Sequence, residues 1–504
     1  MRNIPATMVT QHPDHASVPY WHHEAFISVQ QETEECFRAF SELGATEYKW
    51  DWEGKFVDES VLERLLSEHY EYFQKNPLGK EKFLTFRLPN PLVETEFRLG
   101  RAFINIIAAA GLAKYVKLHT PPMFEVILPM TDSSKTMLSI VEAFHEITSL
   151  KHPLLKHDIN TIEHIELIPL FEDIDTIMDS DKILTEYVEG YAKLFKKKPT
   201  YMRPYVARSD PALNAGIVPT VLAIKLALSK YAQWSKKTGI PTYPVIGCAA
   251  LPFRGGLSPE TVDEFVAEYK GIRTTTIQSA FRHDYPLPLV KKAIKQLEEE
   301  LPKRKAVHID ASEETQLRKI ASAFAKHYTD SIETIAPIVN DVAKHIPKRR
   351  ERVQHVGLFG YSRGVGKVKL PRAIGFTAAM YSIGIPPELI GTGRGLRELM
   401  AQGDDASLKL VEKYFVNLKA NLKQAGAYLN KANLSILAKK SEAWKLILDD
   451  VHAIEIYLGH ELKPMTPEQD EHQIYSTKIL KAVKSDKSAT KLIEKAAILR
   501  RSLG

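Results

Sequence analysis

The chain has 504 residues, of which 44% are hydrophobic and 26% are charged. Both fractions are close to those of ordinary globular proteins, which excludes wholesale disorder and a fibrous repeat. The formal net charge of +6 is too small for a chain of this length to indicate a nucleic-acid-binding protein, although it favours small anionic substrates.

Cysteine content and hydropathy indicate a cytoplasmic protein without a membrane partner. Cys36 and Cys248 cannot build a disulfide framework, and no Cys-x-x-Cys pair is present for zinc. We therefore expect a reducing cytoplasm. The nearest approach to a membrane span, residues 102–113, is shorter than the ~18 residues required, so we expect a buried helix there. The N-terminus lacks the apolar segment of a secretion signal.

Short β-rich runs alternate with longer amphipathic stretches along the chain. Most runs recur every ~30–45 residues, the repeat of a (β/α)8 barrel. Several runs are apolar almost throughout, which is typical of parallel strands buried on both faces. We therefore predict an α/β fold, a (β/α)8 TIM barrel with helical insertions and a helical C-terminal extension. The predicted strands lie within residues 45–52, 82–89, 123–130, 164–172, 203–210, 243–250, 272–279 and 354–362.

The stretches between these runs have helical features. Residues 132–147 and 258–269 open with Asp, Ser or Pro, which favour a helix start. A charged helical insertion is expected at about 287–348, and the chain reads as helix after Leu370. We expect one domain, 1–504, with a barrel core at about 45–385 and the extension at about 386–504. The rival fold, an open doubly wound sheet, would need an early glycine-rich phosphate loop, and the sequence has none.

Polar residues end many of the predicted strands, where barrel enzymes place their active sites. Acidic side chains can hold a hard cation and arginines can bind anions, so we expect an anionic, oxygen-rich substrate. Glu172 and Asp210 end consecutive strands and could bind Mg²⁺ through carboxylate oxygens; alternatively they cap the following helices. The strand-end residues are Asp51, Glu53, Arg87, Thr131, Glu172, Ser209, Asp210, Arg254, Gln278, Arg282 and Arg363.

Two glycine-containing segments carry candidate anion-binding arginines. Arg254 precedes Gly255 and Gly256, which allow close backbone approach to a ligand, or simply form a turn. Arg363 and Arg372 lie in or after a stretch of glycines and basic residues suited to phosphate or carboxylate binding. A basic surface loop is the alternative interpretation of this stretch.

His12 lies in the segment TQHPDH, where the following proline restricts the local backbone. It is a candidate acid–base group, although a lone histidine is more often structural or exposed. The neighbouring residues His15, His22 and His23 have irregular spacing, and no His-Glu-x-x-His motif is present, so we do not predict zinc. The basic runs lack the interleaved aromatic residues of a nucleic-acid site.

In their order and spacing these motifs resemble those of phosphoenolpyruvate carboxylases, specifically the short archaeal-type branch, over nearly the whole chain. The resemblance implies that Glu172 of IPLFEDIDTI and Asp210 of ARSDPALNAG are metal ligands. It implies catalytic or substrate-binding roles for the remaining motif residues, with Arg87 of LTFRLPNP added on a weaker match. These residues are His12 of TQHPDH, Arg254, Gly255 and Gly256 of FRGG, Arg363 of YSR, and Arg372 of KLPRAIGF.

The resemblance also implies a reaction. Phosphoenolpyruvate and bicarbonate would give oxaloacetate and phosphate, through carboxyphosphate and an enolate stabilised by Mg²⁺, with Mn²⁺ as a possible substitute. The arginines would bind the phosphoryl group, His12 would assist the carboxyphosphate step, and the FRGG loop would serve as a lid that excludes water. A homotetramer is implied as well.

The sequence departs from the long bacterial and plant branch at several positions. That branch has a lysine three residues after the metal aspartate, where this chain has Leu213, and a histidine where it has Pro252. The second arginine of the glycine loop is also missing here. Arg273, Arg282 and His283 are nearby candidates for these roles. Two alternatives remain: another metal-dependent barrel lyase acting on phosphoenolpyruvate or a keto acid, and a non-enzymatic anion- or RNA-binding protein.

Overall fold

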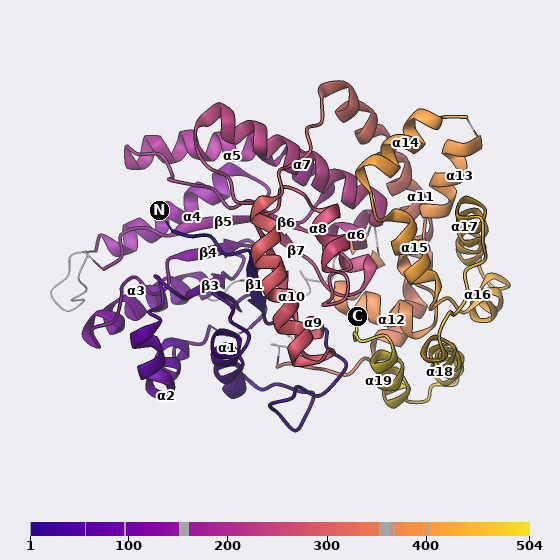
Figure 1. Ribbon diagram of the computed structural model, residues 1–504, viewed down its shortest axis with the longest axis horizontal. Coiled ribbons are helices and arrows are strands. Elements are labelled where there is room, and N and C mark those ends of the chain that lie inside the picture. Colours follow the sequence, from indigo (N-terminus) through magenta and orange to yellow (C-terminus); the bar gives the residue numbers. More distant parts are fainter. Residues whose placement is uncertain are drawn as a thin grey trace.

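Eight parallel strands form a closed barrel in chain order, and β8 pairs with β1 to complete it (Figure 1). The computed structural model describes residues 2–55, 57–94, 97–150, 161–351, 364–365, 368–401 and 403–504. The barrel strands are β1 (Thr7–Thr10), β2 (Glu47–Asp51), β3 (Phe83–Arg87), β4 (Glu125–Leu128), β5 (Glu166–Phe171), β6 (Tyr205–Ala207), β7 (Val245–Gly247) and β8 (Thr274–Ile277).

The barrel has two apolar surfaces because side chains alternate along each strand. Outward-facing side chains join the large core shared with the surrounding helices, which explains why the strands read as nearly continuous apolar runs. A second, smaller cluster fills part of the interior. It consists of Met8, Ile127, Ile168, Leu170, Tyr205, Ala207 and Val245.

The barrel prediction is confirmed, with one strand placed wrongly. Strands β2 to β8 lie within the predicted runs, but the barrel is closed by β1 near the N-terminus, where Thr7 lies opposite Thr275 of β8. The run 354–362, expected to form the last strand, lies outside the described residues. The barrel strands therefore begin at Thr7 rather than near residue 45, and they end at Ile277.

Helices cover the barrel between successive strands. Of the two predicted helix starts, one has a side-chain cap: the Ser133 side chain accepts from Thr136 N at 3.4 Å, whereas the other helix begins at Val262 without a side-chain hydrogen bond from its N-cap Thr261. The Asp173 side chain, which was not predicted as a cap, accepts from Asp175 N at 3.0 Å. These contacts satisfy backbone donors at helix starts. The helices of this region are α1 (Glu32–Ser41), α2 (Val61–Lys75), α3 (Arg98–Tyr115), α4 (Ser134–Thr148), α5 (Ile174–Phe195), α6 (Ser209–Ala215), α7 (Ile217–Thr238), α8 (Val262–Glu268) and α9 (Ser279–His283).

The charged insertion and the extension are helical, as predicted. Figure 1 shows α13 to α19 gathered on one side of the molecule, while the end of the chain returns to the barrel. Leu503 N donates to Asp14 O there at 2.7 Å. The remaining elements are α10 (Leu287–Glu300), α11 (Ala311–Ala343), a short hairpin of β9 (Gly364–Val365) and β10 (Val368–Lys369), α12 (Ala373–Ser382), α13 (Thr392–Ala401), α14 (Asp405–Tyr414), α15 (Leu418–Gly426), α16 (Lys431–Ala438), α17 (Glu442–Leu458), α18 (Pro467–Lys484) and α19 (Thr490–Leu499).

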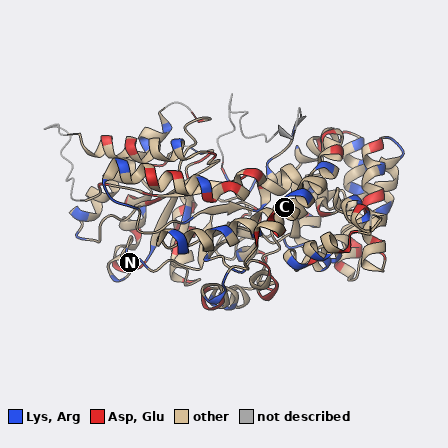
Figure 2. Cartoon of the chain, turned by 90° about the horizontal axis from the view of Figure 1, so that it is seen from above, with Lys and Arg blue, Asp and Glu red and all other residues tan. Residues whose placement is uncertain are grey.

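Charge is distributed over the outer helices. Figure 2 shows acidic and basic residues interspersed in that view. Both cysteines are buried and unpaired with one another. Of the helices that the structure describes, none has by itself the length and apolar character of a membrane span. The segments 373–382 and 387–401 meet that test only when taken together, with a bend of 97° between them.

Candidate active site

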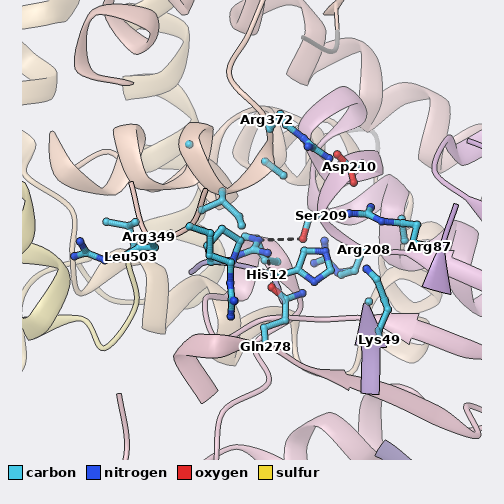
Figure 3. A pocket seen from close by; sticks show the side chains of 18 of the residues that line it. His12, Lys49, Arg87, Arg208, Ser209, Asp210, Gln278, Arg349, Arg372 and Leu503 are labelled. Carbon is cyan, nitrogen blue, oxygen red and sulfur yellow. Dashed lines mark hydrogen bonds between the residues drawn. The ribbon is translucent and has the colours of Figure 1, made fainter. Parts of the chain in front are cut away.

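A cavity of about 300 Å³ opens at the carboxyl ends of the barrel strands. Its wall combines strand ends, the loops that follow them, and parts of the helical extension, so residues far apart in sequence meet there. Figure 3 shows several of these side chains converging on one space. The polar and charged residues in its lining are His12, Lys49, Arg87, Glu172, Tyr205, Arg208, Ser209, Asp210, Arg254, Gln278, Lys348, Arg349, Arg350 and Arg372.

The two predicted metal ligands both line this cavity. Glu172 directly follows β5, and its Oε2 atom accepts a hydrogen bond from Met130 N at 2.9 Å. Asp210 lies in the first turn of α6, after the neighbouring strand β6. Within the described residues no group of three or more His, Cys, Asp or Glu gathers as a metal site. Two carboxylates fit a hard divalent cation that takes its other ligands from water and substrate.

A cluster of charges occupies the neighbouring wall, around Arg87 at the end of β3. Arg87 Nε lies 2.9 Å from Asp51 Oδ1, and Arg87 Nη1 lies 2.5 Å from Glu53 Oε2. Lys49 Nζ lies 3.1 Å from the same Asp51 oxygen, and Arg372 Nη2 lies 3.6 Å from Glu53. Three cations therefore share two carboxylates. We call these five residues the upper cluster.

Arg372 differs from the other members of the upper cluster in its exposure. Its side chain is 48% exposed, whereas those of Arg87 and Lys49 are buried. It precedes α12, at the junction between the barrel and the helical extension. Arg372 can therefore meet an incoming anion at the mouth of the cavity. Arg363, predicted to act beside it, lies outside the described residues.

His12 follows β1 and is partly exposed to the cavity. Its Nδ1 atom lies 2.8 Å from Thr10 Oγ1, a contact that orients the ring. Burial lowers the pKa of His12 well below its ordinary value, and the positive charge of Lys49 lowers this pKa further. The imidazole is therefore neutral near pH 7 and can accept a proton from a bound ligand.

Arg254 also lines the cavity, but most of its donors are already engaged. Its Nε atom donates to Ser209 Oγ at 3.1 Å and its Nη2 atom to Gln278 Oε1 at 2.6 Å. Its Nη1 atom donates to Asp14 Oδ2 at 3.1 Å and to the carbonyl oxygen of Gly504. Four of its five N–H groups are thus occupied. The guanidinium is held rigidly, with one N–H left for a ligand.

Gly255 and Gly256 are not among the described residues that line the cavity. Their φ angles are +115° and +69°, which favour glycine. A Cβ on Gly255 would lie 2.5 Å from Cys248 Sγ. Backbone conformation and crowding therefore account for the glycines, and the substrate-binding role expected for them stays a prediction.

The segment before these glycines has several internal hydrogen bonds in this structure. Residues 252–254 form a buried single turn of 3-10 helix. Arg208 donates to the carbonyl oxygens of Phe253 and Pro252, and Phe253 N donates to Glu388 Oε1 at 2.7 Å. Movement of this segment as a lid would have to break these contacts, and its role as a lid stays a prediction.

The three residues suggested as substitutes for missing long-branch groups do not reach the cavity. Arg273 donates to Ile4 O at 2.7 Å near the opposite end of the barrel. Arg282 lies 3.0 Å from Glu35, and His283 lies 3.5 Å from that same carboxylate. These contacts indicate structural roles.

Sequence reasoning missed Lys49 and Arg208 as cavity residues. For Lys49 a signal was available: it is a lysine inside a strand predicted to be buried, two residues before the strand-end Asp51 and hence on the same face. For Arg208 no signal was available, because its role depends on a loop 45 residues further along the chain.

The comparisons with known proteins identify the family. The sequence model of the family described as "Phosphoenolpyruvate carboxylase" matches residues 4–504. A phosphoenolpyruvate carboxylase of Oenococcus oeni is 38% identical over 510 residues, covering 100% of this chain and 99% of the relative. That of Metallosphaera sedula is 36% identical over 524 residues, with 100% of both chains covered. That of Pyrococcus horikoshii is 38% identical, with 90% and 96% covered. These matches confirm the resemblance drawn from the motifs, and the chain belongs to the phosphoenolpyruvate carboxylase family.

Proposed function

We propose that this protein joins phosphoenolpyruvate and bicarbonate to form oxaloacetate and phosphate. The observation that carries the proposal is one cavity lined by two carboxylates, several cationic side chains and a neutral histidine. These groups match the demands of the chemistry: a cation for an anionic intermediate, fixed donors for a phosphoryl group, and a proton carrier.

Glu172 and Asp210 would hold the divalent cation, which we assign as Mg²⁺ with Mn²⁺ as a substitute. The bound cation would neutralise charge that develops on the substrate oxygens during phosphoryl transfer. The Met130 N–H fixes the Glu172 carboxylate at the strand end. Asp210 is placed by the first turn of α6.

The arginines would bind the phosphoryl group while its bond changes partner. A bicarbonate oxygen forms a bond to phosphorus as the bond from phosphorus to the enolate oxygen breaks, which gives carboxyphosphate and the enolate of pyruvate. Arg372 would meet the phosphate at the cavity mouth, Arg87 would bind it on the wall, and Arg254 would offer its remaining N–H; all three line the cavity. Arg363 remains a proposed fourth member on the strength of its motif.

His12 would carry a proton in the second half of the reaction. Its neutral ring accepts the bicarbonate proton and returns it to the phosphate oxygen as carboxyphosphate separates into CO₂ and phosphate. The enolate carbon then attacks CO₂, which gives oxaloacetate. Because protonation of the enolate would give pyruvate instead, the buried floor of the cavity favours the carboxylation.

A coupled assay tests this function directly. Purified protein is supplied with phosphoenolpyruvate and Mg²⁺, with and without bicarbonate, and oxaloacetate is followed through malate dehydrogenase while phosphate release is measured in parallel. We expect both products to depend on bicarbonate in equal amounts. Turnover of phosphoenolpyruvate or a keto acid without bicarbonate would identify a different barrel lyase, and the absence of turnover would contradict the proposal.

Two properties outside the site belong to the same proposal. We assign the protein to the cytoplasm on its cysteine content and to a homotetramer on the resemblance of its motifs to the family. Light scattering of the active protein at assay concentration would measure its mass, and a mass other than four chains would contradict the tetramer.

A further inference from the structure

One lysine lies within the eight barrel strands that the structure describes, and it lines the cavity. This is Lys49 of β2, whose side chain is 1% exposed. A buried ammonium group is expensive to desolvate, so such residues are rare inside strands. Figure 3 shows its side chain rising from the strand between His12 and Arg87. Its position calls for a reason beyond packing.

Lys49 lies deeper along its strand than the charged residues at the strand ends. It precedes the strand end at Asp51 by two residues, a drop of about 6–7 Å along the strand. The other strand residues that line the cavity are apolar or uncharged apart from Arg87 at the end of β3: Leu170, Tyr205, Ala207 and Gly247. Below the strand ends, Lys49 is therefore the charged residue that the described strands contribute to the cavity. Such a position suits a small anion.

The contacts of Lys49 leave its charge incompletely balanced. Among the described residues its ion-pair partner is Asp51 Oδ1 at 3.1 Å, and that oxygen also accepts from Arg87 Nε at 2.9 Å. The Lys49 Nζ atom is buried and forms no hydrogen bond with the described residues, so its N–H groups are left for a ligand. A bound anion would supply acceptors for them and further negative charge.

We propose that Lys49 is a catalytic residue whose ammonium group binds the bicarbonate at the cavity floor. The inference rests on the proposed function and deepens it by placing the two substrates. Phosphoenolpyruvate, the larger anion, meets Arg372 near the mouth, while the one-carbon anion lies below against Lys49. Among the nearby charges, that of Lys49 also has the largest effect on the pKa of His12, which it lowers. Bicarbonate held there places its hydroxyl beside the neutral imidazole, which takes the proton once carboxyphosphate has formed.

Steady-state kinetics of Lys49→Met and Lys49→Arg test this placement. Methionine keeps the length of the side chain and removes its charge, so we expect KM for bicarbonate to rise about 10- to 100-fold, the worth of a charged hydrogen bond. KM for phosphoenolpyruvate should stay within about twofold. Arginine keeps the charge and should raise KM for bicarbonate less than methionine does. Pyruvate should increase relative to oxaloacetate in Lys49→Met.

Lys82→Met is the matched control. Lys82 is also a buried lysine, immediately before β3, but it donates to Ala45 O at the other end of the barrel. Both KM values should match the wild type in that variant. A thermal melt checks folding. If Lys49→Met does not fold, Lys49→Arg is used instead: a larger rise in KM for bicarbonate than in KM for phosphoenolpyruvate would support the placement, and the reverse would overturn it.

Three outcomes separate the possibilities. A selective rise in KM for bicarbonate supports the placement. Equal rises for both substrates, or none in a folded variant, overturn it and leave Lys49 a partner of Asp51 only. If the wild-type protein itself makes no oxaloacetate from bicarbonate, the proposed function fails, and the failure is seen before any variant is measured.

Discussion

The two ends of the barrel interior contain charge clusters of opposite character. At the amino ends of the strands, Arg203 contacts Glu47 at 2.8 Å and Glu125 at 2.7 Å, and all three side chains are inaccessible to solvent. Arg2 also pairs with both carboxylates. We call these four residues the lower cluster. Two cations meet two acids there, and none of the four is among the described residues that line the active-site cavity.

Strand β2 contributes to both clusters, because every second side chain of a strand lies on the same face and Glu47, Lys49 and Asp51 therefore all lie on the inner face of the barrel. The lower cluster pairs two arginines with two carboxylates away from the active-site cavity, whereas Lys49, Arg87 and Arg372 of the upper cluster line that cavity. Burying a balanced pair is near neutral for stability, but removing one partner is costly. Cations that line a cavity instead create affinity for an anionic ligand. The comparison predicts that substitutions in the lower cluster affect the stability of the fold, whereas substitutions at the cavity end of the barrel affect catalysis.

The largest effect on turnover is expected at the two proposed metal ligands, at the cavity end of the barrel. In Glu172→Gln or Asp210→Asn the loss of a metal-binding carboxylate should reduce turnover at least ~1000-fold, equivalent to about 4 kcal/mol of transition-state stabilisation. Apparent Mg²⁺ affinity should weaken, measured by activity and by metal titration in calorimetry.

Asp173→Asn provides the neighbouring control. Asp173 caps α5 next to Glu172 but does not belong to the described lining of the cavity. Its substitution should leave turnover intact and cost at most about 1 kcal/mol of stability. Near-normal magnesium titrations in the Glu172 and Asp210 variants would remove both from the site.

The next largest effect is expected in the lower cluster. Arg203→Met leaves Glu47 and Glu125 buried with Arg2 as their remaining arginine, so the free energy of unfolding should fall by about 3–5 kcal/mol. Urea unfolding followed by circular dichroism measures the change. Arg101→Met removes an exposed pair with Glu59 and should cost less than about 1 kcal/mol. A small loss in Arg203→Met would show that the balanced cluster is dispensable.

His12→Asn should alter products more than stability. Without the neutral imidazole, oxaloacetate formation should fall about 100-fold or more. Phosphate release should fall less, because the first transfer does not require the ring, and the enolate should appear as pyruvate. Parallel assays of phosphate, pyruvate and oxaloacetate measure the split. An unchanged ratio of oxaloacetate to phosphate would remove His12 from the second step.

The smallest effect is a pH dependence at the upper end. Burial, and then the charge of Arg87, lower the pKa of Lys49 to about 8, against the opposing charge of Asp51. His12 faces the same side chain and is neutral throughout this range. Lys49 is therefore a cation at pH 7 and loses its proton as pH rises through 8. KM for bicarbonate should increase about fourfold between pH 7 and 8.5, and a pH-independent KM would contradict a bound ammonium.

The motifs predict most of the residues that line the cavity, but they do not predict the hydrogen bonds and ion pairs of these residues. His12, Arg87, Glu172, Asp210 and Arg254 all reach one cavity because each follows or ends a strand, and the carboxyl ends of parallel strands meet at one edge. Arg254 is less available than its motif suggested, since its partners come from four separate parts of the chain. For Gly255 and Gly256 the positive φ angles account for glycine, and the substrate-binding role implied by the resemblance stays a prediction.

Strand β1 shows why the closure of the barrel was harder to predict. Its four residues, TMVT, are too few to display an alternating or continuous apolar pattern, and they gain their strand partners only from β2 and from β8, which lies more than 260 residues away. The run at 354–362 had the stronger local pattern, so it was chosen as the eighth strand.

The sequence by itself determined the repeating strand–helix order, the helical C-terminal region and the acidic and basic residues at strand ends, because these depend on patterns within short segments. The tertiary structure alone decided which strand closes the barrel, which donors of Arg254 are occupied, and where Lys49 meets Arg87 and His12. Those outcomes depend on pairings between distant segments, whose distances no local pattern encodes.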